Sequence, residues 1–161
     1  MSRTYRIKNV HVLPVSLAEA WDFFSRAENL QKITPPEMAF TVTSDPGGDH
    51  IYAGQVIEYT LKPLSGIPIY WMTEITHVKE QAYFVDEQRF GPYSLWHHQH
   101  RFREVENGVE MTDLVHYRIP LGWLGDLANL ILVKKKLHDL FEYRTRAINE
   151  RFGVTSGRKL L

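Results

Sequence analysis

The spacing of apolar and polar residues predicts the order of the structural elements along the chain. Residues 5–13 are apolar at intervals and predict a strand, which Pro14 ends. The segment 16–19 (Ser-Leu-Ala-Glu) then matches a capping box, in which the Ser and Glu side chains satisfy free backbone N–H groups at the start of a helix. That helix and a second short helical segment at 27–33 end before Pro35.

From residue 40 onward the apolar residues recur with a period of two, which is typical of strands. Strands are expected at 40–42, 54–62, 69–79, 82–90, 95–105 and 109–119. A stripe with a period near 3.6 then predicts a helix of about thirty residues, ended by Gly153. Its members are Leu124, Leu127, Ile131, Leu137, Phe141, Ile148 and Phe152.

This order of elements predicts an α+β helix-grip fold. A curved antiparallel sheet of about seven strands would wrap round the long C-terminal helix, with two short helices after the first strand. Only the C-terminal helix is long enough to cover the apolar face of the sheet, and a gap between the two layers is a common place for a ligand. We expect 1–153 to form a single domain and 154–161 to be a short tail.

Composition removes several classes of function. The 19 basic and 19 acidic residues cancel, so no net charge attracts nucleic acid, and the absence of cysteine excludes disulfides, zinc–thiolate sites and thiol catalysis. No signal peptide is recognisable, and the most apolar stretch, 121–133, is too short to span a bilayer. We therefore expect a soluble, cytoplasmic protein with no stable membrane insertion. The oligomeric state is left open.

Three neighbouring strands carry polar residues on faces that are otherwise apolar. Because side chains alternate along a strand, these residues cannot all turn to solvent without exposing large aromatic ones. The shared faces consist of Ala82, Phe84, Asp86, Gln88 and Phe90, then Trp96, His98, His100 and Phe102, then Met111, Asp113, Val115 and Tyr117.

The turns indicate that these polar groups meet. A two-residue turn at 107–108 (Asn-Gly) would place Phe102 opposite Asp113, so that inner positions of both strands face each other. In the preceding hairpin, a five-residue loop would set Asp86 opposite His100, and a three-residue loop would set it opposite His98. Either register brings together Asp86, Gln88, His98, His100, Asp113 and Tyr117.

Three interpretations of this polar group are open. It is a structural network in which histidines satisfy buried carboxylates, or the polar floor of a ligand cavity, or a metal site of the His-x-His type. The His-x-His spacing alone is weak evidence, so no metal and no cofactor are predicted.

The same residues resemble a known family signature. The run Phe84-x-Asp86-x-Gln88-x-x-Gly91-Pro92-Tyr93-x-x-Trp96-x-His98-x-His100-x-Phe102 is similar to that of one branch of the START-like (SRPBCC) superfamily. Segments 20–24, 111–122 and 141–144 also match this branch, which contains bacterial ligand-binding proteins sometimes fused to nucleoside-sugar epimerase domains. The superfamily includes Bet v 1-like proteins, polyketide cyclases and coenzyme Q-binding proteins, so the resemblance implies a helix-grip fold with a deep apolar cavity.

The leading hypothesis is a binder or carrier of a hydrophobic small molecule, lipid-like or polycyclic aromatic. The predicted binding residues are Ile57, Tyr59, Trp71, Phe84, Asp86, Gln88, Trp96, His98, His100, Phe102, Met111, Asp113, Tyr117, Leu127, Ile131 and Phe141.

The alternative is a polyketide cyclase or dehydratase. Its candidate catalytic residues are His98 or His100 as general acid/base, Asp113 as the partner of the imidazole, and Tyr117 as a hydrogen-bond donor. A third idea is transient membrane contact through Trp123, Leu124 and Lys134–Lys136.

Overall fold

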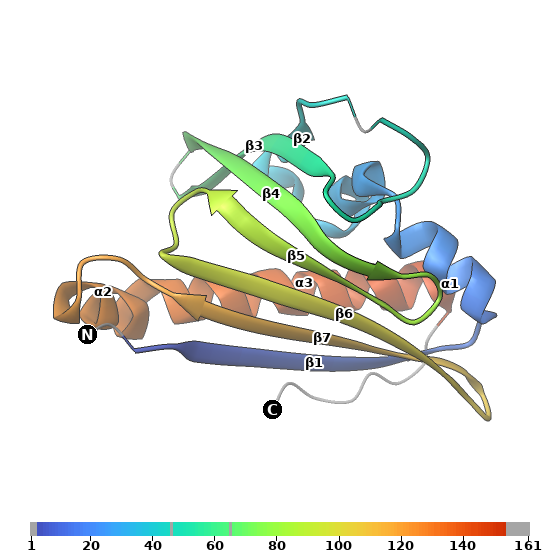
Figure 1. Ribbon diagram of the computed structural model, residues 1–161. Coiled ribbons are helices and arrows are strands. Elements are labelled where there is room, and N and C mark those ends of the chain that lie inside the picture. The colour runs from blue at the N-terminus through green and yellow to red at the C-terminus, as the bar shows by residue number, and fades with distance from the viewer. Residues whose placement is uncertain (1–2, 46, 65, 154–161) are drawn as a thin grey trace.

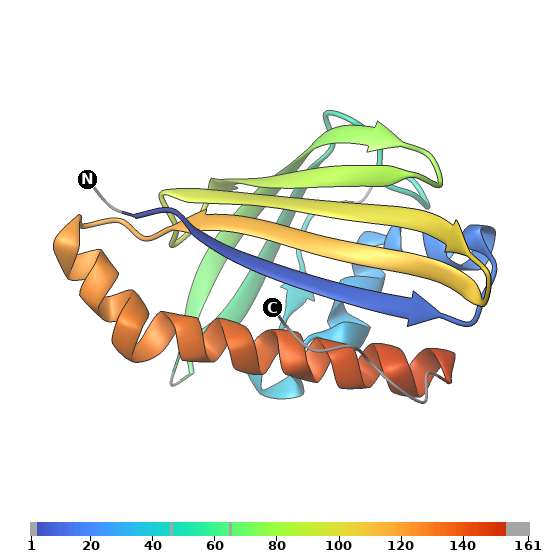
Figure 2. The same cartoon turned by 90° about the horizontal axis from the view of Figure 1, so that it is seen from below.

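An antiparallel sheet of seven strands curves round one long helix in the computed structural model, as predicted (Figures 1 and 2). The structure describes residues 3–45, 47–64 and 66–153, so the tail predicted at 154–161 lies outside it. The strands lie in the order β1-β7-β6-β5-β4-β3-β2. The elements are β1 (Tyr5–Leu13), α1 (Leu17–Phe24), η1 (Ala27–Ile33), η2 (Pro36–Met38), β2 (Thr41–Val42), β3 (Val56–Leu64), β4 (Ile67–Lys79), β5 (Tyr83–Phe90), β6 (Leu95–Val105), β7 (Gly108–Arg118), α2 (Trp123–Ala128), η3 (Asn129–Val133) and α3 (Lys134–Phe152).

The predicted capping box starts α1. The Glu19 backbone N–H donates to Ser16 Oγ over 3.2 Å, and the Ser16 N–H donates to Glu19 Oε2 over 3.0 Å. This start aims the buried side chains of Trp21 and Phe23 at the end of the sheet, where Trp21 packs edge-on against Phe102. Together with η1 and η2, α1 closes the part of the sheet that the long helix leaves uncovered (Figure 1).

The β6–β7 turn lies one residue earlier than predicted. Val105 pairs with Gly108, so the turn residues are 106–107, and the predicted pairing of Phe102 with Asp113 is wrong. The positive φ of 131° falls on Gly108, where a Cβ would also collide with the carbonyl of Leu13, so the glycine is needed at the strand start. The register moves by two residues, which preserves the face of every side chain.

The β5–β6 hairpin adopts the register of the three-residue loop, with Asp86 opposite His98. On the other side of β5, an irregularity in its pairing with β4 lies between Gln88 and Phe90. This bulge turns Phe90 to the outer face, where it packs against Tyr70 and is 61% exposed. Phe90 therefore does not belong to the inner face, contrary to prediction.

The long helix changes phase in its first third. The π-helical turn η3 has more residues per turn than an α-helix, so it shifts which residues face the sheet. In α2 and η3 the buried residues are Gly125 and Asn129. In α3 the buried residues are Leu137, Phe141, Arg144 and Ile148. The predicted stripe is thus confirmed for α3 and wrong for its first three members, Leu124, Leu127 and Ile131, which are exposed. Among the described residues, no helix is long and apolar enough to cross a membrane.

Candidate functional site

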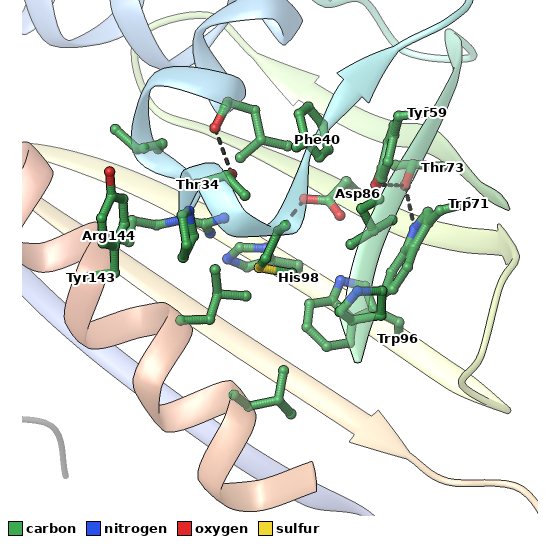
Figure 3. Close-up of a pocket in the computed structure, with 18 of the residues that line it drawn as sticks. Thr34, Phe40, Tyr59, Trp71, Thr73, Asp86, Trp96, His98, Tyr143 and Arg144 are labelled. Atoms are coloured by element: carbon green, nitrogen blue, oxygen red, sulfur yellow. Dashed lines mark hydrogen bonds and ion pairs between the residues drawn. The ribbon is translucent and has the colours of Figure 1, made fainter. Parts of the chain in front are cut away.

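A cavity of about 700 Å³ lies between the inner face of the sheet, the η1–η2 segment and α3. Figure 3 shows side chains from the sheet and from the helix converging on it. Its volume lies in the range of ~300–1,000 Å³ that is usual for small-molecule sites. The apolar part of its wall includes Leu30, Ile33, Phe40, Ile57, Leu61, Trp71, Phe84, Trp96, Met111, Val133 and Leu137.

One end of the cavity is aromatic, and Thr73 is the hydrogen-bond partner of two of its polar groups. Thr73 Oγ1 lies 2.6 Å from the Tyr59 hydroxyl and accepts a hydrogen bond from Trp71 Nε1 over 3.0 Å (Figure 3). Trp71 also packs edge-on against Trp96, with 5.4 Å between ring centroids. This end therefore offers a ligand mainly flat apolar surfaces.

The floor of the cavity is a compact cluster of two carboxylates and two imidazoles. Asp86 Oδ2 lies 2.8 Å from His100 Nε2 and 3.5 Å from His98 Nδ1. Asp113 Oδ1 lies 3.1 Å from His98 Nε2 and 2.9 Å from His100 Nδ1. Each carboxylate thus contacts both rings, whose centroids are 3.7 Å apart. We call Asp86, His98, His100 and Asp113 the His–Asp cluster.

The pKa values of the two histidines are shifted in opposite directions. Burial lowers the pKa of His98, and the neighbouring His100 lowers it further. Burial acts in the same direction on His100, but the carboxylates of Asp113 and Asp86 outweigh it and raise the pKa of His100 to about 8. Hence His100 is the cation of the cluster at neutral pH, while His98 is a neutral bridge.

Both carboxylates of the cluster are ionised. Burial favours their protonated forms, but the histidines outweigh it, so that the pKa of Asp86 is lowered and that of Asp113 lies well below its usual range. Two buried negative charges therefore face one imidazolium inside the cluster. The cluster is thus net negative, and α3 contributes a buried cation that this charge attracts through space.

Arg144 is this cation, and it reaches from α3 toward the cluster (Figure 3). Arg144 is only 8% exposed, and its Nε has no hydrogen-bond partner. Burial lowers the pKa of its guanidinium, which Asp113 and Asp86 oppose from a distance. It also lies 5.2 Å from the ring centroid of Phe141.

Most of the predicted binding residues line the cavity, and the prediction fails for six of them. The residues that line it are Ile57, Tyr59, Trp71, Phe84, Asp86, Trp96, His98, His100, Met111 and Asp113. The remaining predicted residues lie outside its wall: Gln88, Phe102, Tyr117, Leu127, Ile131 and Phe141.

Gln88 and Tyr117 have structural partners instead. The Gln88 side chain donates to the Tyr93 carbonyl over 2.6 Å and accepts from its N–H over 3.2 Å, which closes the β5–β6 loop. The Tyr117 hydroxyl donates to Asn129 Oδ1 over 3.0 Å and joins β7 to η3. The catalytic role considered for Tyr117 therefore lacks a path to the cavity.

The other four residues lie outside the cavity wall for two simple reasons. Phe102 and Phe141 belong to the solid core, because the first packs on Trp21 and the second is fully buried under the cluster. Leu127 and Ile131 face away from the sheet, and Ile131 is 69% exposed.

From the sequence, Arg144 was named only as part of the matching segment 141–144 and assigned no role, and a buried polar pair on β1 was not predicted. Asn9 and His11 lie on the inner face of β1, where Asn9 Nδ2 donates to Thr145 Oγ1 of α3 over 3.0 Å and lies 2.9 Å from His11 Nε2. A signal existed for Arg144, because it falls between Phe141 and Ile148 on the apolar stripe of the helix.

Asp86, His98 and His100 also have the chemistry of a metal-ligand set. Their ligand atoms lie within 4.8 Å of one another. One nitrogen of each ring is hydrogen-bonded to a carboxylate, His98 Nε2 with Asp113 Oδ1 at 3.1 Å and His100 Nε2 with Asp86 Oδ2 at 2.8 Å. The other nitrogen of each ring lies within 3.5 Å of a carboxylate oxygen. These residues therefore already form hydrogen bonds and ion pairs with one another.

Comparisons with known proteins identify the fold. No family model and no curated protein matches the chain. Among solved structures, ginseng major latex-like protein 151 from Panax ginseng is similar with a TM-score of 0.65 and 13% identity over 92% of this chain and 97% of that one. Ara h 8.0201 matches with a TM-score of 0.57 and 14% identity, over 92% and 99% of the two chains.

The third similar structure is a nucleoside-diphosphate sugar epimerase from Corynebacterium glutamicum. Its TM-score is 0.63 and the identity is 19%, over 89% of this chain and 28% of the epimerase. At such identities the likeness is one of fold. The chain has the START-like helix-grip fold that is also found in the Bet v 1-like structures.

Proposed function

We propose that the protein binds a hydrophobic small molecule in the cavity between the sheet and α3. The observation that carries the proposal is the cavity itself, which has a volume of about 700 Å³ and is walled by aromatic and aliphatic side chains. A solid core of the same elements would bury these side chains against one another and leave no such space. Burial of apolar ligand surface against this wall supplies the binding free energy.

Binding without catalysis is favoured over cyclase or dehydratase chemistry. His98 and His100 line the cavity, but one nitrogen of each ring is hydrogen-bonded to Asp113 or Asp86, and the other nitrogen lies within 3.5 Å of a carboxylate oxygen. A general base needs a free nitrogen within hydrogen-bond reach of the substrate. Turnover of a polyketide substrate that is lost in His100→Phe, while binding persists, would reverse this preference.

A matched pair of variants tests the binding site. Ile69 and Ile67 lie two residues apart on β4, but Ile69 lines the cavity whereas Ile67 is 65% exposed outside its wall. We expect Nile red, a neutral apolar dye, to bind the wild type and Ile67→Trp with the same affinity. Ile69→Trp should weaken binding by filling the cavity.

The same variants can be used to identify the natural ligand. Solvent extraction of the purified wild type followed by mass spectrometry should release an apolar compound that is depleted from Ile69→Trp. Equal Nile red affinity of all three proteins, or no affinity in any, would contradict the proposal.

A second observation supports loading from a membrane. Large apolar side chains are exposed along 121–132, and Trp123 is 73% exposed. Asp126, the acidic residue of this segment, is turned toward the start of β1, where it accepts a hydrogen bond from the Tyr5 hydroxyl over 3.0 Å. We define the docking patch as Leu121, Trp123, Leu124, Leu127, Leu130, Ile131 and Leu132.

The charges beside the docking patch indicate an anionic bilayer as its partner. Lys134, Lys135 and Lys136 are exposed and follow the patch on the same helix. Lys135 pairs with Asp139 at 2.9 Å, whereas no described residue forms an ion pair with Lys134 or Lys136. An apolar face flanked by lysines matches the acyl and headgroup layers of an anionic membrane surface.

The docking patch is also continuous with the cavity. Leu132 belongs to the patch and lines the cavity, and Lys136 lines it one turn further along the helix. A bilayer that covers the patch would therefore lie against the cavity rim, where an apolar molecule can pass between the two.

Vesicle sedimentation tests this docking. The wild type should sediment with vesicles of phosphatidylserine and phosphatidylcholine, less so at high salt and not with phosphatidylcholine alone. Leu130→Ser should abolish sedimentation, whereas Ile67→Ser, an equally exposed apolar position on β4, should not. No sedimentation of the wild type, or a dimer in solution that Leu130→Ser dissociates, would contradict membrane docking.

A further inference from the structure

Arg144 is a buried cation without a direct partner in the wall of the cavity. Across residues 3–45, 47–64 and 66–153, no hydrogen bond or ion pair involves its guanidinium, and its Nε is enclosed and unsatisfied. The residue nevertheless lines the cavity (Figure 3). A guanidinium has five N–H donors, and leaving them unmade away from water is costly.

The two carboxylates that attract Arg144 belong to the His–Asp cluster. Asp86 and Asp113 each contact both histidines of the His–Asp cluster, and neither approaches the guanidinium within 4.0 Å. They attract Arg144 through space and keep it charged, but they do not satisfy its donors. The protein thus holds a cation in place and leaves its hydrogen-bonding face for another molecule.

The position of this face relative to the apolar wall defines the shape of a ligand. Arg144 reaches in from the helix side beside His98, while Tyr59, Trp71 and Trp96 lie on the opposite side and form the aromatic end of the cavity (Figure 3). A molecule that contacts both must be apolar over most of its length and carry hydrogen-bond acceptors at one end. The planar guanidinium fits a carboxylate best, because two parallel N–H···O bonds can form.

We propose that Arg144 anchors the carboxylate of an apolar monocarboxylic acid whose hydrocarbon body lies along the aromatic wall. This inference rests on the proposed function, since it names the chemical class of the molecule in that cavity. The imidazolium of His100 offsets part of the negative charge below the site, so that a further carboxylate is tolerated there.

Calorimetry with matched probes tests the anchor. Dodecanoate and dodecan-1-ol share a chain and differ in the head group, and Nile red reports on the apolar cavity alone. We expect dodecanoate to bind the wild type at least about tenfold more tightly than dodecan-1-ol, as a charge-assisted pair provides. Naphthalene-2-carboxylate against 2-naphthol distinguishes an aromatic from an aliphatic body.

Variants locate the effect. Arg144→Met should remove the preference for dodecanoate and leave Nile red and dodecan-1-ol binding unchanged. Arg144→Lys, which retains the charge without the planar fork, should retain part of the preference. Arg101→Met removes a cation from the exposed outer face of β6 and should change nothing.

The outcomes separate the two proposals. Equal binding of dodecanoate and dodecan-1-ol by the wild type overturns the anchor and leaves the apolar cavity standing, and this comparison needs no variant to fold. A preference that survives in folded Arg144→Met also overturns it. Failure of Nile red and of all the other probes to bind the wild type overturns the proposed function and the anchor together.

Discussion

The sheet wall and the helix wall of the cavity treat buried charge in opposite ways. On the sheet, Asp86 and Asp113 contact His98 and His100 at 2.8–3.5 Å, so every ionised group has a partner. On the helix, Arg144 is also buried, but within the part of the chain that the structure describes it has no hydrogen-bond or ion-pair partner. Paired charges hold a fold together, whereas a buried unpaired charge beside a cavity indicates where a ligand completes the site.

Removal of one carboxylate from the cluster should have the largest effect on stability. Asp113→Asn leaves the buried imidazolium with one carboxylate, and we expect a loss of about 3–5 kcal/mol in the free energy of unfolding, measured with urea. Glu110→Gln on the outer face of the same strand breaks an exposed pair with Arg103 and should lose less than about 1 kcal/mol. Equal losses would mean that the cluster is not the main electrostatic support of the sheet.

The pH dependence of the cluster should be the next largest effect. Because the pKa of His100 is raised from 6.5 to about 8 in the fold, its contribution is complete below pH 6.5 and is lost as the pH rises through 8. The stability gap between the wild type and His100→Gln should thus shrink by on the order of 2 kcal/mol across this window. A gap that stays constant or widens on the alkaline side contradicts the assignment of His100 as the cation.

Tyr117→Phe tests whether this hydroxyl is structural. The substitution removes the hydrogen bond to Asn129 at the junction of β7 and η3, and we expect a loss of about 1 kcal/mol with unchanged Nile red affinity. A loss of ligand affinity without a loss of stability would place Tyr117 in the site after all.

Arg144→Met should have the smallest effect on stability. No hydrogen bond is broken, and the gain from removing a buried charge offsets the lost attraction of Asp86 and Asp113, so the unfolding free energy should stay within about 1 kcal/mol of the wild type. A loss as large as that of Asp113→Asn would mean that Arg144 is a fifth member of the cluster rather than a free anchor.

The sequence was sufficient for the fold and for the composition of the sheet wall. The alternation of residues in β5, β6 and β7 placed Asp86, His98, His100 and Asp113 on one face, and an error of two residues in the β6–β7 register left that face intact. Side chains of a strand alternate between two faces, so a register error of an even number of residues leaves every side chain on its predicted face.

The helix wall was harder to predict, because a shift of phase in a helix turns side chains to a different direction. The π-helical turn at Asn129–Val133 changes the phase of the stripe, which turned Leu127 and Ile131 outward, and no local pattern marks such a turn. Arg144 was assigned no site role because a charged residue normally faces solvent, although its spacing from Phe141 and Ile148 placed it on the buried stripe.

A structure of the protein with dodecanoate would show whether Arg144 anchors a carboxylate. We expect the hydrocarbon chain to lie against Trp71 and Trp96 and a carboxylate oxygen to lie within about 2.7–3.2 Å of the Arg144 guanidinium, with the His–Asp cluster unchanged. A carboxylate held by Lys136 at the rim, or bound directly to His98 or His100 in place of an aspartate, would contradict it.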